Sequence, residues 1–174
     1  MVHDYRMTEA IENLSDLITS QGDGREFFAR NHITQGMATL FREGLLRLAG
    51  RSDQAAFELA QAMGGGKTHL MNAIGLLAKH PGLRAEVLPA ELADRLDFGP
   101  ARIAAFNGRN DPDHFIWGEI AIQLGQAELI RPYWIDGPRG VDEKKWLKIL
   151  GDEPTLILLD ELPPYLLNAD TRAV

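Results

Sequence analysis

The chain has 174 residues, 45% of them hydrophobic, and its 18 Lys and Arg against 25 Asp and Glu give a formal net charge of −7. This length suits one domain with a proper core, and the acidic balance argues against a nucleic-acid-binding surface in this segment. The lack of cysteine excludes disulfides, zinc–thiolate sites and thiol catalysis. Without a signal-like or membrane-spanning apolar run, we expect a cytoplasmic protein with no membrane partner.

Two amphipathic helices are predicted in the first third of the chain. Apolar residues repeat at helical spacing over 8–20, and a Gly-rich segment ends that pattern. Thr34 has the position of an N-cap for a longer helix, which Gly50 stops. Gly44 lies on the apolar stripe of this helix and would let a neighbouring element approach closely. We expect residues 1–52 to form a helical prefix that packs on the core.

Residues 61–68, with the sequence Gln-Ala-Met-Gly-Gly-Gly-Lys-Thr, have the features of a phosphate-binding loop. They follow a short strand predicted over 57–60 and precede a helix predicted over 67–79. Glycines let backbone N–H groups point at an anion, and the helix adds the positive end of its dipole. In that arrangement Lys67 reaches the β- and γ-phosphates of ATP, and the Thr68 hydroxyl ligates Mg²⁺.

The loop departs from the usual pattern at its first position, where glycine is replaced by Gln61. The alternative is a Gly-rich turn that caps an ordinary helix. A Lys-Thr pair between the glycines and the helix favours the phosphate-binding loop. The residues predicted to bind nucleotide are Gly64, Gly65, Gly66, Lys67, Thr68 and, one turn into the helix, His69.

The middle of the chain is predicted to be mostly helical. Pro81 and Gly82 end the phosphate-loop helix, and a short helix follows over 90–96. Residues 101–106 read as a strand that Asn-Gly ends. Further helices are expected from 111–113 to Leu124, over about 127–134 and over 142–150.

The most hydrophobic strand, 155–159, runs directly into Asp160 and Glu161. Such a pattern is typical of a buried parallel strand that presents carboxylates at its carboxyl end, where ligands of these sheets bind. We interpret it as a Walker B motif, in which Asp160 holds Mg²⁺ and Glu161 deprotonates the attacking water, with Lys67 as the second catalytic residue. The alternative, a strand ending in an acidic turn, is disfavoured by the phosphate-binding loop upstream.

Together the motifs predict an α/β fold, the three-layer P-loop NTPase sandwich with a mostly parallel sheet, of which 53–174 form the amino-terminal part. A glutamate directly after the Walker B aspartate is typical of P-loop proteins that insert an extra strand between the phosphate-loop strand and the Walker B strand. The sheet would then be incomplete, because the chain ends soon after the Walker B strand. We therefore expect this chain alone to be a weak or inactive ATPase.

These residues resemble a known family, the AAA-type ATPases called domain of unknown function 499 (DUF499), which are often encoded in phage-defence and restriction-like islands. The likeness covers residues 27–28, 32–36, 61–69, 117–125, 136–138 and 158–161. It implies a P-loop ATPase that uses ATP and Mg²⁺, forms a homo-oligomer when complete, and works with defence proteins such as a methyltransferase or helicase. Members are much longer than this chain, so the resemblance implies an amino-terminal portion.

Three functional hypotheses follow from the sequence. The leading one is Mg²⁺-dependent ATP hydrolysis. A nucleotide-binding regulatory module without turnover is the second, because no sensor residue or arginine finger can be assigned. A P-loop small-molecule kinase is the third, and it would need an acceptor-binding lid.

Overall fold

The computed structural model describes residues 11–59, 66–110, 114–135 and 140–172. Within these ranges the protein is mostly helical, and it contains a parallel sheet of two strands, β1 (Arg102–Asn107) and β2 (Thr155–Asp160). The register pairs Asn107 with Asp160, so both strands end at the same edge. The predicted mixed α/β architecture is confirmed, as are the two strands.

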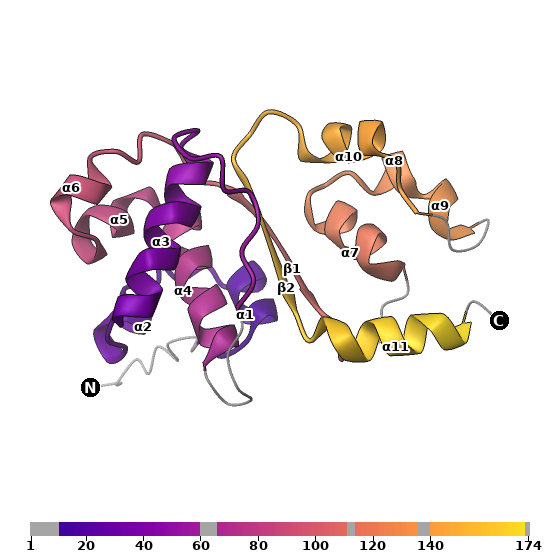
Figure 1. The fold of residues 1–174 in the computed structure, drawn as a ribbon, viewed down its shortest axis with the longest axis horizontal. Coiled ribbons are helices and arrows are strands. Elements are labelled where there is room, and N and C mark those ends of the chain that lie inside the picture. The colour runs from indigo at the N-terminus through magenta and orange to yellow at the C-terminus, as the bar shows by residue number, and fades with distance from the viewer. Residues whose placement is uncertain (1–10, 60–65, 111–113, 136–139, 173–174) are drawn as a thin grey trace, which may run out of the picture.

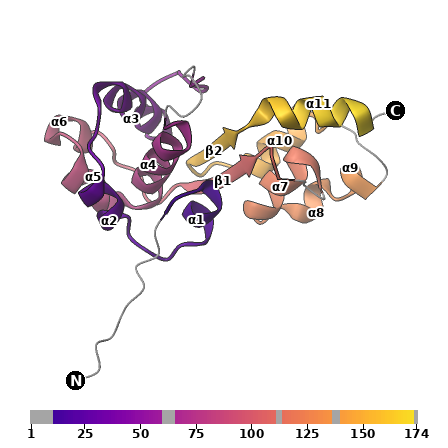
Figure 2. The same ribbon diagram turned by 90° about the horizontal axis from the view of Figure 1, so that it is seen from below.

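Helices cover both faces of this sheet (Figures 1 and 2). One side carries the helices before β1, which are α1 (Leu14–Thr19), α2 (Arg25–Arg30), α3 (Gln35–Leu48), α4 (Lys67–Lys79), α5 (Pro81–Val87) and α6 (Ala90–Ala93). The other side carries α7 (Phe115–Gln123), α8 (Ala127–Ile130), α9 (Pro132–Ile135) and α10 (Glu143–Leu150), and α11 (Leu162–Arg172) follows β2. No helix in the described ranges is long and apolar enough to cross a membrane.

Successive side chains of the strands enter two different cores, because strand residues alternate between the faces of a sheet. Leu156 and Leu158 pack with the side chains of α1 to α5, whereas Ala104 and Ile157 pack with those of α7, α8 and α10. Coverage of both faces explains why β2 is an almost continuous apolar run rather than an alternating one.

The helix predicted over 67–79 is confirmed as α4, and all its residues from Leu70 to Ala78 are buried. Glycines bring neighbouring helices close to it. A Cβ on Gly75 would meet Leu17 Cδ2 at 2.3 Å, and a Cβ on Gly44 would meet Ile74 Cδ1 at 2.8 Å. The close approach expected at Gly44 is therefore confirmed, and it joins α3 to α4.

The strand predicted over 57–60 is wrong for its described part, 57–59, which has no regular structure. A strand needs a neighbour for its backbone N–H and C=O groups, and within the described ranges the sheet consists of β1 and β2 alone. Phe57 is 40% exposed rather than buried in a sheet. The order of a phosphate-loop strand relative to β2 therefore stays a prediction.

Capping residues account for the helix boundaries that the periodicity misplaced. The first helix begins at Leu14 because Asn13 Oδ1 accepts the Asp16 N–H at 3.0 Å and Asp16 Oδ2 accepts the Asn13 N–H at 3.0 Å. Pro81 does end α4, but it also occupies the first position of α5, where its missing N–H costs nothing. The longer helix begins after its predicted N-cap, Thr34, as expected. Helices α2, α5 and α11 were not predicted.

His80, at the end of α4, makes the stability of this helical layer sensitive to pH. Burial lowers its pKa from the ordinary 6.5, Lys79 lowers it further, and Asp23 opposes this. The folded state then binds a proton less readily than the unfolded chain, so the stability is full above pH 6.5 and falls as the pH drops towards the lowered pKa. Between about pH 7 and pH 5 we expect a larger fall in urea midpoint for the parent than for His80→Gln. Equal falls would contradict this assignment.

Candidate functional site

Helix α4, which follows the predicted phosphate-binding loop, begins at Lys67, directly after its N-cap Gly66. Gly66 has a φ of 76°, in the left-handed region where a residue with a Cβ is strained. Lys67 and Thr68 thus occupy the first turn of α4, where the positive end of the helix dipole favours an anion. The predicted Gly64 and Gly65 lie outside the described residues, so their roles stay predictions.

The structure joins the two predicted motifs through one hydrogen bond. The Thr68 hydroxyl, on α4, donates to Asp160 Oδ2, at the carboxyl end of β2, with an oxygen–oxygen distance of 2.5 Å. Asp160 is 7% exposed, and its other carboxylate oxygen accepts the backbone N–H of Glu161 at 3.0 Å. These two hydrogen bonds hold the Asp160 carboxylate at the carboxyl end of β2, beside the first turn of α4.

Glu161 follows in a left-handed conformation, with a φ of 52°. Its side chain forms an ion pair with Arg109, with 3.2 Å between Arg109 Nη2 and Glu161 Oε1. Arg109 reaches it because β1 ends beside β2: the N–H of Gly108 donates to the Asp160 carbonyl oxygen at 2.8 Å. The segment after β1 therefore sets the position of the predicted general base.

Gly108 has no room for a larger residue, and this leads to a test. A Cβ at this position would lie 2.1 Å from the backbone oxygen of Glu161, so Gly108→Ala must displace the Glu161 backbone. We expect a loss of about 1–3 kcal/mol in the free energy of unfolding, measured by urea denaturation. Gly82→Ala is the matched control, because a Cβ there would meet nothing within 4 Å. Equal urea midpoints for the two variants would contradict the close approach.

His69, the third predicted residue of α4, turns its ring towards α2. It stacks on Phe27 with 4.5 Å between ring centres and an interplanar angle of 25°. Phe27 itself is buried and contacts Phe28 edge to face, with ring centres 5.2 Å apart. The rings of His69, Phe27 and Phe28 thus form a continuous row of contacts from the first turn of α4 to α2.

The oxygen atoms of Thr68 and Asp160, which the hydrogen bond brings together, suit Mg²⁺ better than a softer metal. A threonine hydroxyl and a carboxylate are hard oxygen ligands, and Mg²⁺ is commonly bound by one or two such protein groups together with substrate phosphates and water. In the described part of the chain, no group of three or more His, Asp or Glu residues is placed to hold a metal ion. Thr68 and Asp160 are the predicted metal ligands, and the structure brings their oxygens together.

Sequence reasoning found the two ends of this site but missed Gly108, Arg109 and Phe27. The sequence pattern of Asn107 and Gly108 predicts only the end of a strand. It carried a usable signal, since residues that follow two adjacent parallel strands meet at one edge. Nothing in the local pattern around Phe27 indicates that it stacks on His69.

A family model, the DUF499 N-terminal domain, matches residues 2–92, which is more than half of the chain. The matched range contains Lys67, Thr68 and His69 and ends before β1, so it covers the α4 side of the site. No curated protein and no solved structure matches the chain.

Proposed function

The chain belongs to the DUF499 family, and on that premise we propose that it binds ATP with Mg²⁺ and hydrolyses it as an AAA-type P-loop ATPase. The observation that carries the proposal is the hydrogen bond from Thr68 Oγ1 to Asp160 Oδ2, at 2.5 Å. The two residues are 92 positions apart and belong to two motifs that each predict phosphate chemistry. Their contact is the arrangement that a Walker A and a Walker B motif would require.

In this proposal each side chain has a separate role. Lys67 makes charge-assisted contacts with the phosphate oxygens of ATP. Thr68 and Asp160 hold Mg²⁺, which when bound supplies positive charge next to those oxygens. Glu161 orients a water molecule towards the terminal phosphate and takes its proton.

The arrangement of elements supports a P-loop sandwich as the underlying fold. Helices lie on both faces of a parallel sheet, and the proposed site lies at the carboxyl end of its strands. In the described ranges β2 pairs with β1 on one edge. We propose that a further strand belongs on the other edge of β2, between it and the phosphate-binding loop.

Nucleotide binding without turnover is the second candidate, and one observation favours it. Arg109 engages the Glu161 carboxylate, so the ion pair occupies an oxygen that would otherwise face the attacking water. From the resemblance to defence-associated ATPases, we further propose that the complete protein forms a homo-oligomer and acts against foreign DNA together with partner enzymes.

Calorimetric titration with Mg·ATP tests the binding step. Lys67→Ala removes a cation at the start of α4, and we expect its Kd to rise by roughly tenfold to hundredfold. Asp160→Asn should weaken binding only when Mg²⁺ is present. Lys148→Ala, on the exposed side of α10, is the control and should match the parent. Equal affinity for Lys67→Ala and the parent would show that the loop is structural.

A further inference from the structure

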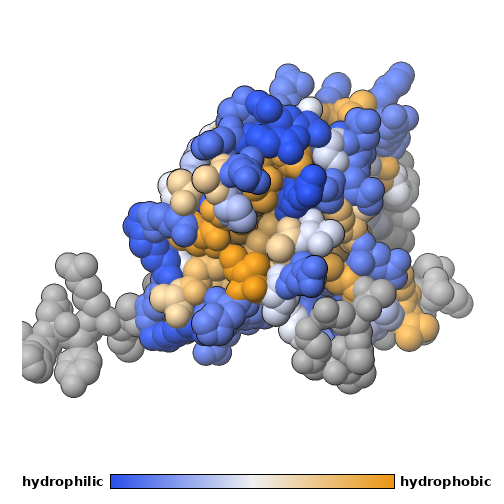
Figure 3. All heavy atoms as spheres, turned by 60° about the vertical axis from the view of Figure 1, so that its left-hand side comes forward, coloured by the Kyte–Doolittle hydropathy of each residue, from blue (hydrophilic) through white to orange (hydrophobic). Residues whose placement is uncertain are grey.

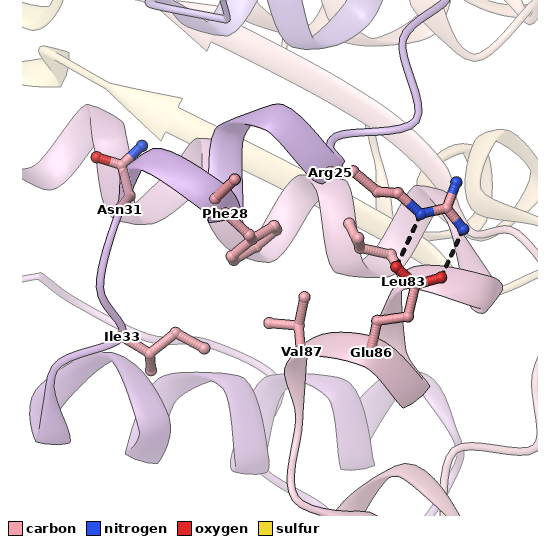
Figure 4. A pocket seen from close by; sticks show the side chains of 8 residues that line it. Arg25, Phe28, Asn31, Ile33, Leu83, Glu86 and Val87 are labelled. Atoms are coloured by element: carbon pink, nitrogen blue, oxygen red, sulfur yellow. Dashed lines mark hydrogen bonds and ion pairs between the residues drawn. The ribbon is translucent and has the colours of Figure 1, made fainter.

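A cavity of about 380 Å³ lies between α2 and α5 (Figure 4). Five of its eight lining residues are apolar, among them Phe28, Ile33, Leu83 and Val87, and the other three are Arg25, Asn31 and Glu86. This volume is within the range of sites that hold a small organic ligand. The side of the molecule that carries α2, α5 and α6 also shows an apolar area enclosed by hydrophilic side chains (Figure 3).

An ion pair at one end holds the walls of the cavity in place. Arg25, on α2, donates from Nε to Glu86 Oε2 at 2.8 Å and from NH2 to Glu86 Oε1 at 2.5 Å. The hydrogen bond from Arg25 lowers the pKa of Glu86, so the pair stays charged at neutral pH. These two hydrogen bonds link α2 to α5 at one end of the pocket.

Two ring contacts connect this pocket with the proposed phosphate site. Phe28 lines the pocket and touches Phe27 edge to face, and Phe27 stacks on His69, the residue after Thr68. In a nucleotide the ribose separates the base from the phosphates. If the phosphates lie at the first turn of α4, the site for the base must therefore lie nearby but apart from that turn. Phe28 in the pocket is linked to His69, the residue after Thr68, through the ring of Phe27, so the pocket lies two ring contacts away from the first turn of α4.

We propose that this pocket holds the adenine base of the nucleotide whose phosphates contact Lys67 and Thr68. This inference rests on the proposed function and deepens it. Aromatic and aliphatic walls suit the flat, weakly polar faces of a purine, and Phe28 offers a ring against which the base can pack. Ile33 is 37% exposed, so apolar surface is available for the base to cover.

The test compares three ligands on the 174-residue chain by calorimetry: Mg·ATP, Mg·tripolyphosphate and adenosine. Phe28→Ala should weaken ATP binding by roughly tenfold to hundredfold and leave tripolyphosphate binding unchanged. Ile33→Ser, at a partly exposed position, should act in the same direction if Phe28→Ala fails to fold. Ile135→Ser, on α9, is the matched control and should change neither affinity. Adenosine should bind the parent and Lys67→Ala equally.

The outcomes separate the base site from the phosphate site. If the parent binds both phosphate ligands and the pocket variants keep the parent's affinity for ATP, the base lies elsewhere and the pocket serves another occupant, such as a partner's side chain. Equal affinity of the parent for ATP and tripolyphosphate would also overturn the proposal, because the base would then add nothing. If the parent binds neither phosphate ligand, the proposed function fails and this inference fails with it.

Discussion

Arg84→Met is expected to lower the free energy of unfolding by at least about 3 kcal/mol. Arg84 is 2% exposed, and its guanidinium packs over the ring of Phe98 with 3.6 Å to the ring centre. It donates hydrogen bonds to five backbone carbonyl oxygens, those of Leu77, Ala78, Leu96, Phe98 and Gly99. Methionine fills similar space but removes the Arg84 donor from all five carbonyls, of which Ala78 still accepts the Ala101 N–H at 2.9 Å, and each uncompensated loss is costly.

Urea denaturation measures this loss, with two further variants as controls. Burial lowers the pKa of Arg84 to about 10, so the guanidinium is still charged at neutral pH. Arg84→Lys keeps a charge but lacks the planar fork, so we expect an intermediate loss. Arg42→Met changes a side chain that is 64% exposed and should stay within about 0.5 kcal/mol of the parent. Equal midpoints for Arg84→Met and Arg42→Met would show that the carbonyls find other partners.

The comparison of Arg84 with Lys67 shows what the sequence can predict in this chain. Lys67 stands in a contiguous pattern of glycines, Lys-Thr and an apolar helix, and that local pattern predicts both the helix start and the position of the side chain on it. The five carbonyls around Arg84 come from the end of α4 and from the segment before β1. Such a convergence is a property of tertiary packing, so no local pattern distinguishes Arg84 from the exposed arginines.

The same distinction holds at the site. The sequence predicted that Thr68 and Asp160 would meet, because a phosphate loop and the end of a parallel strand each have a fixed place at the edge of a sheet. It did not predict the Arg109–Glu161 ion pair or the pocket beside Phe28, since both depend on loop and helix positions that have no periodic signal. The strand predicted over 57–60 is wrong for residues 57–59 for a related reason. A strand-like composition is not enough without a neighbouring strand.

Glu161→Gln is expected to reduce ATP hydrolysis at least a hundredfold and to leave ATP binding intact. The amide keeps the shape of the side chain but cannot accept a proton from water, and general base catalysis contributes roughly 10²–10⁴-fold in enzymes. Phosphate release and calorimetry, measured on a form of the protein that hydrolyses ATP, check the two halves of this expectation. Glu128→Gln, at a side chain that is 83% exposed, is the control and should hydrolyse ATP at the parent rate. Unchanged hydrolysis in Glu161→Gln would remove the Walker B assignment.

Arg109→Ala separates an ATPase from a binding module, because it releases the carboxylate that Glu161→Gln neutralises. In the leading proposal the ion pair competes with water for Glu161 Oε1, so loss of Arg109 should raise the rate of phosphate release or leave it unchanged. In the double variant the rate should fall to that of Glu161→Gln alone, since Arg109 acts through that carboxylate. If a form extended through the following strands and its Arg109→Ala variant both bind Mg·ATP but release no phosphate, the protein is a nucleotide-binding module. Its Glu161 would then serve to fix the end of β1 against the end of β2.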